Sequence, residues 1–112
     1  MTLNELSTAV QHGARPVIVV FNNGRYGTIR THQERTYPGR VSGTDLANPD
    51  FAALARAYGG HGETVERQEE FGPAFERALA SGTVAMIDCK LDSEALTPGL
   101  TLSEVRAQGE GR

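Results

Sequence analysis

The sequence predicts a three-layer α/β fold, in which a parallel sheet carries helices on both faces. An unbroken apolar run at residues 17–21 is typical of a strand covered on both sides, the habit of a central strand in a parallel sheet. A second, mostly apolar run lies at residues 84–89. Segments with helical and strand patterns alternate along the chain, as right-handed crossovers between parallel strands require.

The first element is a helix expected at residues 3–12. Thr2 and Glu5 have the spacing of a capping box, in which a hydroxyl and a carboxylate accept hydrogen bonds from exposed backbone N–H groups. Apolar residues follow at helical spacing, and Gly13 provides a stop. Such a helix would normally connect an earlier strand to the one at residues 17–21, so we expect the chain to be part of a longer protein.

The stretch from residue 22 to residue 43 is long, charged and rich in turn residues, without obvious secondary structure. Connections of this length are usually functional or disordered. Because it begins with a tight Asn-Asn-Gly sequence, we expect an ordered site at its start, followed by a mobile segment at residues 36–43.

A second helix is expected after Asn48, with Asn48 as the N-cap, Pro49 at the first helical position and Asp50 in the first turn. Its buried stripe is expected to be Phe51, Leu54, Ala55 and Tyr58. Residues 63–66 are a candidate short strand.

A third helix precedes the apolar run at residues 84–89, and Pro73 is tolerable in it only within the first turn. Its buried stripe is expected to be Phe71, Ala74, Phe75, Ala78 and Leu79. Residues 1–95 then form the domain proper, and residues 96–112 form a C-terminal tail with at most a short helical turn begun by Thr101 and Glu104.

Composition excludes several classes of protein. The chain has 112 residues and a formal net charge of −3, so no overall field draws it to nucleic acid or to an anionic membrane. Arginines recur in residues 25–40, but Glu34 interrupts them, which favours a solvated loop or subunit contact over a nucleic-acid interface. No apolar run approaches the ~20 residues of a membrane span. The single Cys89 excludes an internal disulfide and fits a cytoplasmic location.

The sequence Asn22-Asn23-Gly24-Arg25 is the main candidate for chemistry. An Asn oxygen is a neutral, hard ligand that suits Mg²⁺ or Ca²⁺ where carboxylate or phosphate oxygens share the site. The following glycine lets the loop turn so that a backbone carbonyl can face the same ion. The alternative is ordinary turn chemistry, since Asn and Gly are common after strands for conformational reasons alone.

Three motifs together resemble a known family. They are Glu5-Leu6-x-Thr8-Ala9, Asn22-Asn23-Gly24-x-Tyr26-Gly27-x-x-Arg30, and Asn48-Pro49-Asp50-Phe51-x-x-Leu54-Ala55-x-x-Tyr58-Gly59. With the closing strand, they resemble the C-terminal, diphosphate-binding domain of thiamine diphosphate-dependent enzymes, in the branch of acetolactate synthase and benzoylformate decarboxylase. The resemblance covers roughly residues 1–91.

The resemblance implies a set of site residues. In the family, Mg²⁺ binds the diphosphate of the cofactor. Its protein ligands are the Asp of a Gly-Asp-Gly motif, the second Asn of the pair and a backbone carbonyl two residues after that Asn. Here this implies Asn23 and the main-chain oxygen of Arg25 as metal ligands, with Asn22 as a supporting residue. No catalytic residue is implied, and Ile29 stands where some relatives carry a catalytic acid. The implied cofactor-binding residues are Asn23, Gly24, Arg25, Tyr26, Gly27 and Ile29.

The chain lacks the Gly-Asp-Gly motif and the domain that binds the cofactor's pyrimidine. The resemblance therefore implies a fragment of a homo-oligomeric parent enzyme that acts on 2-oxo acids, by decarboxylation or by acetolactate synthase-like carboligation. Its partners would be the missing pyrimidine-binding and middle domains, and FAD in a middle domain is left open. We expect the isolated chain to be inactive. The alternative is a free-standing small α/β module that binds a partner or nucleotide without catalysis.

Overall fold

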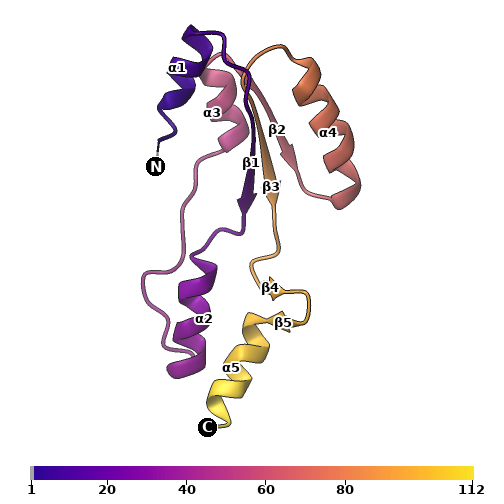
Figure 1. The fold of residues 1–112 in the computed structure, drawn as a ribbon. Coiled ribbons are helices and arrows are strands. Elements are labelled where there is room, and N and C mark those ends of the chain that lie inside the picture. The colour runs from indigo at the N-terminus through magenta and orange to yellow at the C-terminus, as the bar shows by residue number, and fades with distance from the viewer. Residues whose placement is uncertain (1) are drawn as a thin grey trace. The chain divides into compact units, whose positions relative to one another are not determined.

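A computed structural model describes residues 2–112 (Figure 1). The chain divides into two compact units, which are described in turn. The first unit consists of the described residues up to Asn22 together with Asn48–Lys90, and the second consists of Asn23–Ala47 and Leu91–Arg112. No helix among residues 2–112 has the length and apolar character needed to cross a membrane.

The first unit contains a parallel sheet of three strands, which confirms the predicted sheet. The strand order is β1 (Val17–Asn22), β3 (Ala85–Lys90), β2 (His61–Val65). Ala85 pairs with both Val17 and His61, so the strands begin level and their carboxyl ends share one edge of the sheet.

The central strand is β3, whereas the sequence predicts the run at residues 17–21 as central. In this chain β1 is an edge strand with half-buried residues, and Phe21 is 72% exposed. All but the last residue of β3 is buried. An unbroken apolar run therefore predicts that a strand is packed on both faces, but it does not predict which strand is central in the sheet.

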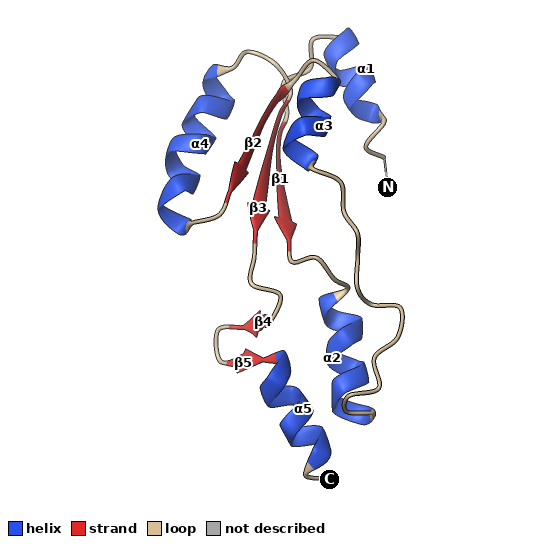
Figure 2. Cartoon of the chain, turned by 180° about the vertical axis from the view of Figure 1, so that it is seen from behind, coloured by secondary structure: helices blue, strands red, loops and turns tan. Residues whose placement is uncertain are grey.

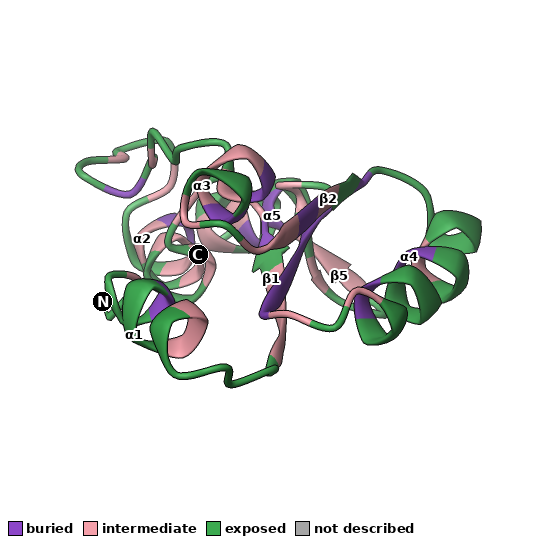
Figure 3. Cartoon of the chain, turned by 90° about the horizontal axis from the view of Figure 1, so that it is seen from above, coloured by how far each residue is buried: buried purple, intermediate pink, exposed green. Residues whose placement is uncertain are grey.

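Helices cover both faces of the sheet, which confirms the predicted three layers (Figure 2). One face packs against α4 (Gln68–Ala80), and the other packs against α1 (Glu5–Gln11) and α3 (Phe51–Ala57). Successive residues of β3 serve the two faces, since Ile87 packs with the α4 side and Met86 with the α1 and α3 side. In the first unit, most of the buried residues lie in β3 and on α1, α3 and α4, as the view from above shows (Figure 3).

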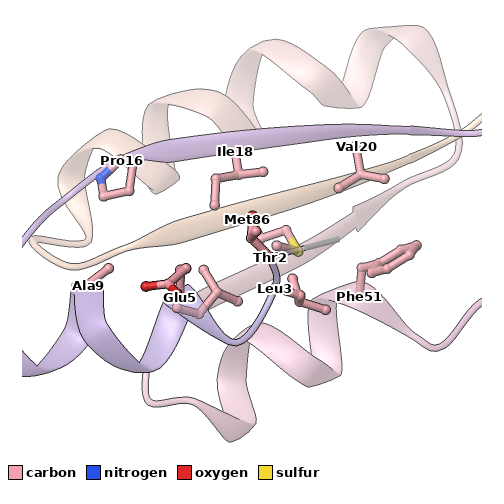
Figure 4. A pocket seen from close by; sticks show the side chains of 10 residues that line it. Thr2, Leu3, Glu5, Ala9, Pro16, Ile18, Val20, Phe51 and Met86 are labelled. Carbon is pink, nitrogen blue, oxygen red and sulfur yellow. The ribbon is translucent and has the colours of Figure 1, made fainter.

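An apolar hollow of about 480 Å³ lies between α1, β1 and α3. Ile18 and Val20 of β1 point into it, opposite Leu3 and Phe51 (Figure 4). The cover over the edge strand β1 is therefore looser than the cover over β3.

Two helix starts differ from the prediction. The N-cap of α1 is Asn4 and makes no side-chain cap, so the predicted Thr2 capping box is wrong, and the Thr2 backbone carbonyl instead accepts from the Glu5 N–H at 2.9 Å. The N-cap of α3 is Asp50, which accepts from the Ala53 N–H at 3.0 Å.

Pro73 lies beyond the first turn of α4, which begins at Gln68. The helix accepts it at the cost of one backbone bond, because proline has no N–H for the Glu69 carbonyl four residues earlier. Of the predicted stripe, Ala74 and Ala78 are buried, whereas Leu79 is 61% exposed.

The second unit contains α2 (Gly27–Thr36), the antiparallel strands β4 (Ala95–Thr97) and β5 (Leu100–Thr101), and α5 (Leu102–Glu110). The expectation of a loop at residues 27–36 is therefore wrong. The helix start at Thr101 and Glu104 is confirmed as a full capping box, but α5 is longer than the single turn expected. The mobility of residues 36–43 and the domain boundary at residue 95 stay predictions.

A buried carboxylate joins α2 to α5. Glu34 is 1% exposed, and it accepts from Arg106 Nε at 2.8 Å, from the Gly39 N–H at 2.9 Å and from Arg30 Nε at 3.0 Å. Chiefly the hydrogen bond from Arg106, against the opposing effect of burial, lowers the pKa of Glu34 from 4.5 to about 2. The polar helix α2 is thus held against α5 by a charged pair, because it has no apolar stripe that could pack there.

The Glu34 anchor makes the second unit sensitive to acid. Because its pKa is depressed in the folded state, Glu34 contributes stability that is fully present above pH 4.5 and is lost as the pH falls toward 2. At neutral pH, Glu34→Gln should lower the free energy of unfolding by about 3 kcal/mol, since two arginines lose a buried counter-charge. Urea unfolding followed by circular dichroism at several pH values should show the two proteins converging toward pH 2. A constant difference between them at every pH would contradict the assignment.

Candidate functional site

At the carboxyl ends of β1 and β3, a polar network surrounds a fully buried acid, Asp88. The Asn22 amide donates to Asp88 Oδ1 at 3.1 Å, and Lys90 Nζ lies 3.1 Å from Asp88 Oδ2. Asn48, predicted as a helix cap, instead donates from its amide to the Asn22 Oδ1 at 3.0 Å. Asn22 is therefore part of this network, and the supporting role that the resemblance implies for it stays a prediction.

Sequence reasoning missed Asp88, because it lies within an apolar run. The available signal was the acid itself, since a charged residue inside a buried strand needs partners. The neighbouring Cys89 is buried, as expected for a core residue. Burial, together with the charge of Asp88, raises the pKa of the Cys89 thiol, so it stays protonated and unreactive at neutral pH.

In the second unit, the loop that follows Asn22 in the chain has the turn that the sequence predicts. Gly24 has a φ of +70°, in the left-handed region that glycine enters without strain. Within this turn, Oδ1 of Asn23 accepts from the Arg25 N–H at 3.3 Å. The Asn23 oxygen keeps a second lone pair for another partner.

A short antiparallel bridge pairs Arg25 with Asp45. The Tyr26 N–H donates to the Thr44 carbonyl and the Leu46 N–H donates to the Gly24 carbonyl, each at 2.9 Å. In this type of pair the facing residues do not bond to each other, so their own N–H and C=O groups point away from the opposite strand. Because the Arg25 N–H meets Asn23 Oδ1, the Arg25 carbonyl and the Asn23 oxygen are directed to the same side of the bridge.

The other predicted cofactor-binding residues lie around the start of α2. A Cβ at Gly27 would come within 3.0 Å of the Asn23 amide nitrogen, so glycine leaves space for that side chain. Tyr26 and Ile29 are about half exposed, at 52% and 53%. A polar hollow of about 450 Å³ brings Asn23 and Gly27 together with residues of α2 and the β4–β5 hairpin; it is lined by Asn23, Gly27, Thr28, Thr31, His32, Arg35, Ala95, Leu96, Thr97 and Leu100.

The donor chemistry decides what this loop could hold. Within residues 2–112, no group of three His, Cys, Asp or Glu side chains could bind a metal ion. Asn23 and the Arg25 carbonyl offer neutral, hard oxygens, which suit Mg²⁺ only if anionic oxygens complete its shell. Nε of Arg25 is also buried and makes no hydrogen bond within the described chain. The residues present therefore fit one side of a cation that a phosphate ligand holds from the other side.

Comparison with known proteins adds an independent finding. The family described as "Thiamine pyrophosphate enzyme, C-terminal TPP binding domain" matches residues 1–89. The chain is 35% identical to the mitochondrial acetolactate synthase catalytic subunit of Saccharomyces cerevisiae, over 84% of this chain and 14% of that protein. It is also 35% identical to the sulfoacetaldehyde acetyltransferase of Castellaniella defragrans, over 70% of this chain and 13% of that protein.

A solved structure agrees in fold. Benzoylformate decarboxylase from Polynucleobacter necessarius matches 87% of this chain and 18% of its own, with a TM-score of 0.74 and 29% sequence identity. The chain spans about one seventh of the length of the two curated relatives.

The Asp88 network gives a test of the first unit. Asp88→Ala removes the carboxylate oxygen that accepts from the buried Asn22 amide and should lower the free energy of unfolding by about 2 kcal/mol. Asp88→Asn keeps an acceptor oxygen of the same shape and should cost less than half of that. Urea titrations of the three proteins provide the measurement, and equal losses in the two variants would show that the Lys90 ion pair matters more than the bond from Asn22.

Proposed function

Because the chain belongs to the thiamine pyrophosphate enzymes, as part of their C-terminal TPP-binding domain, we propose a role for the loop at residues 23–25. This loop supplies part of a Mg²⁺ clamp for the cofactor's diphosphate. The observation that carries the proposal is the Arg25–Asp45 bridge. It directs the Arg25 carbonyl to the side on which Asn23 Oδ1 receives the Arg25 N–H.

Each residue of the loop has a defined task in this clamp. Asn23 provides a side-chain oxygen, Arg25 provides a main-chain oxygen, and Gly24 provides the left-handed turn between them. Gly27 leaves room for the Asn23 side chain beside α2. Tyr26 and Ile29 expose large side chains next to this loop, and they would form one wall of the cofactor pocket.

The proposed substrate class is the 2-oxo acids. Support comes from the names of two similar proteins: the substrate named in benzoylformate decarboxylase is a 2-oxo acid, and an acetolactate synthase is named for the formation of acetolactate. Bound thiamine diphosphate would supply the carbon nucleophile, and the protein would position and polarise it. The reaction is therefore a decarboxylation or a carboligation, and the residues proposed here bind the cofactor and carry out no proton transfer.

The clamp is incomplete in these 112 residues, because both proposed ligands are uncharged. A carboxylate ligand and a domain for the cofactor's pyrimidine ring would come from other parts of a larger, homo-oligomeric enzyme. The 112-residue chain alone should therefore hold the cofactor weakly and should not catalyse.

We expect the chain to bind thiamine diphosphate only at millimolar concentration and only with Mg²⁺ present, since two neutral oxygens hold a divalent ion weakly. Titration followed by NMR should shift the Asn23 side-chain amide and the Gly24 and Arg25 backbone amides in a saturable manner. Asn23→Leu, which has a similar size but no oxygen, should abolish these shifts.

Calorimetry of cofactor binding to the 112-residue chain can contradict this proposal. Micromolar binding by the isolated chain would contradict the incomplete clamp, and cofactor binding independent of Mg²⁺ and of Asn23 would favour a binding module of another kind. A Gln68→Leu variant, changed at an exposed position of α4 in the first unit, is the control for non-specific effects.

A further inference from the structure

Gln33 on α2 holds the segment of residues 42–46, called here the backing segment, at two points. Its amide donates from Nε2 to the Ser42 carbonyl at 2.8 Å, and its Oε1 accepts from the Thr44 hydroxyl at 3.2 Å. Thr44 is only 2% exposed, so its hydroxyl has little access to water as an alternative partner. One side chain therefore satisfies a buried hydroxyl and fixes the backing segment along α2.

The backing segment in turn sets the direction of the Arg25 carbonyl. Its bonds with Gly24 and Tyr26 flank Arg25 and leave the Arg25 peptide groups turned outward. In antiparallel pairing, a slip of one residue exchanges bonded and non-bonded positions. Such a slip breaks the bonds that hold the Gly24 carbonyl and the Tyr26 N–H toward the backing segment, so the outward direction of the Arg25 carbonyl would no longer be fixed.

The ion pair between the backing segment and Arg30 contributes little to this register. Arg30 Nη1 lies 3.5 Å from Asp45 Oδ1, but Asp45 is 77% exposed at its side chain, where water screens an ion pair. The two bonds of Gln33 reach Ser42 and Thr44, two residues apart in the segment, and they have fixed roles because the amide oxygen accepts and the amide nitrogen donates.

We propose that Gln33 is a positioning residue for the divalent cation of the clamp, acting through the backing segment on the Arg25 carbonyl. The inference rests on the proposed function and adds to it the group that sets the direction of a main-chain ligand. Gln33 itself touches neither the cation nor the cofactor.

The test uses Mn²⁺, a paramagnetic substitute for Mg²⁺, with thiamine diphosphate and the 112-residue chain. Broadening of the Gly24, Arg25 and Tyr26 amide signals in NMR gives the Mn²⁺ dissociation constant even when binding is weak. Gln33→Met keeps the length of the side chain but removes both hydrogen bonds, and it should weaken Mn²⁺ binding about tenfold, as loss of a group that orients a ligand does. Gln108→Met, the same change at an exposed position of α5, is the matched control and should bind as the unaltered chain does.

Thr44 provides a second pair of variants that preserves the fold more closely. Thr44→Val removes only the hydroxyl and should weaken Mn²⁺ binding by a smaller factor than Gln33→Met, whereas Thr44→Ser keeps the hydroxyl and should bind normally. Hydrogen exchange at the Tyr26 and Leu46 amides reports the bridge itself and should quicken in the weakened variants alone.

The outcomes separate the two proposals. Saturable broadening that Asn23→Leu abolishes, with unchanged affinity in Gln33→Met and Thr44→Val, would overturn the role of Gln33 and leave the clamp standing. Broadening that does not depend on Asn23 would overturn the clamp, and the role of Gln33 with it. A loss of urea stability in Gln33→Met without a change in Mn²⁺ affinity would show that Gln33 serves folding alone.

Discussion

The site depends on one small piece of backbone pairing, the bridge between Arg25 and Asp45. Two hydrogen bonds, from Tyr26 to Thr44 and from Leu46 to Gly24, decide which way the peptide groups of Arg25 face. With the bridge in place, a main-chain carbonyl and the Asn23 amide oxygen are directed to the same side, as the proposed clamp requires. Gly24 permits the turn that brings them together, since its φ of +70° is strained for other residues.

The two units are stabilised by different interactions. In the first, alternate side chains of β3 enter two apolar layers, and the hydrophobic effect favours both. In the second, α2 has little apolar surface and is joined to α5 through the buried charge of Glu34. Gly109 allows this contact, because a Cβ there would lie 2.6 Å from the Glu34 carbonyl oxygen. The unit that carries the proposed ligands is therefore the one whose stability depends on pH, through the ionisation of Glu34.

The sequence predicts the first unit well because its information is local. Apolar runs and helical spacing give the strands, the crossovers and the three layers, while cap positions shift by a residue or two since Asn, Asp and Thr can all serve as caps. The sequence does not reveal α2, whose anchor is a pairing of Glu34 with Arg106 far along the chain. Asp88 was hidden for a similar reason, because its partner Asn22 comes from another strand.

The candidate ligands Asn23 and Arg25 could be named from the motif and the family resemblance, but the groups that orient them could not. Gln33 and Thr44 are ordinary polar residues whose importance comes from contacts across a turn. The most direct test of the clamp is a crystal structure of the chain grown with Mn²⁺ and thiamine diphosphate, in which anomalous scattering locates the metal. We predict a peak about 2.1 Å from both Asn23 Oδ1 and the Arg25 carbonyl oxygen. A peak bound only to acidic side chains elsewhere, or an Arg25 carbonyl turned toward residues 42–46, would contradict the account.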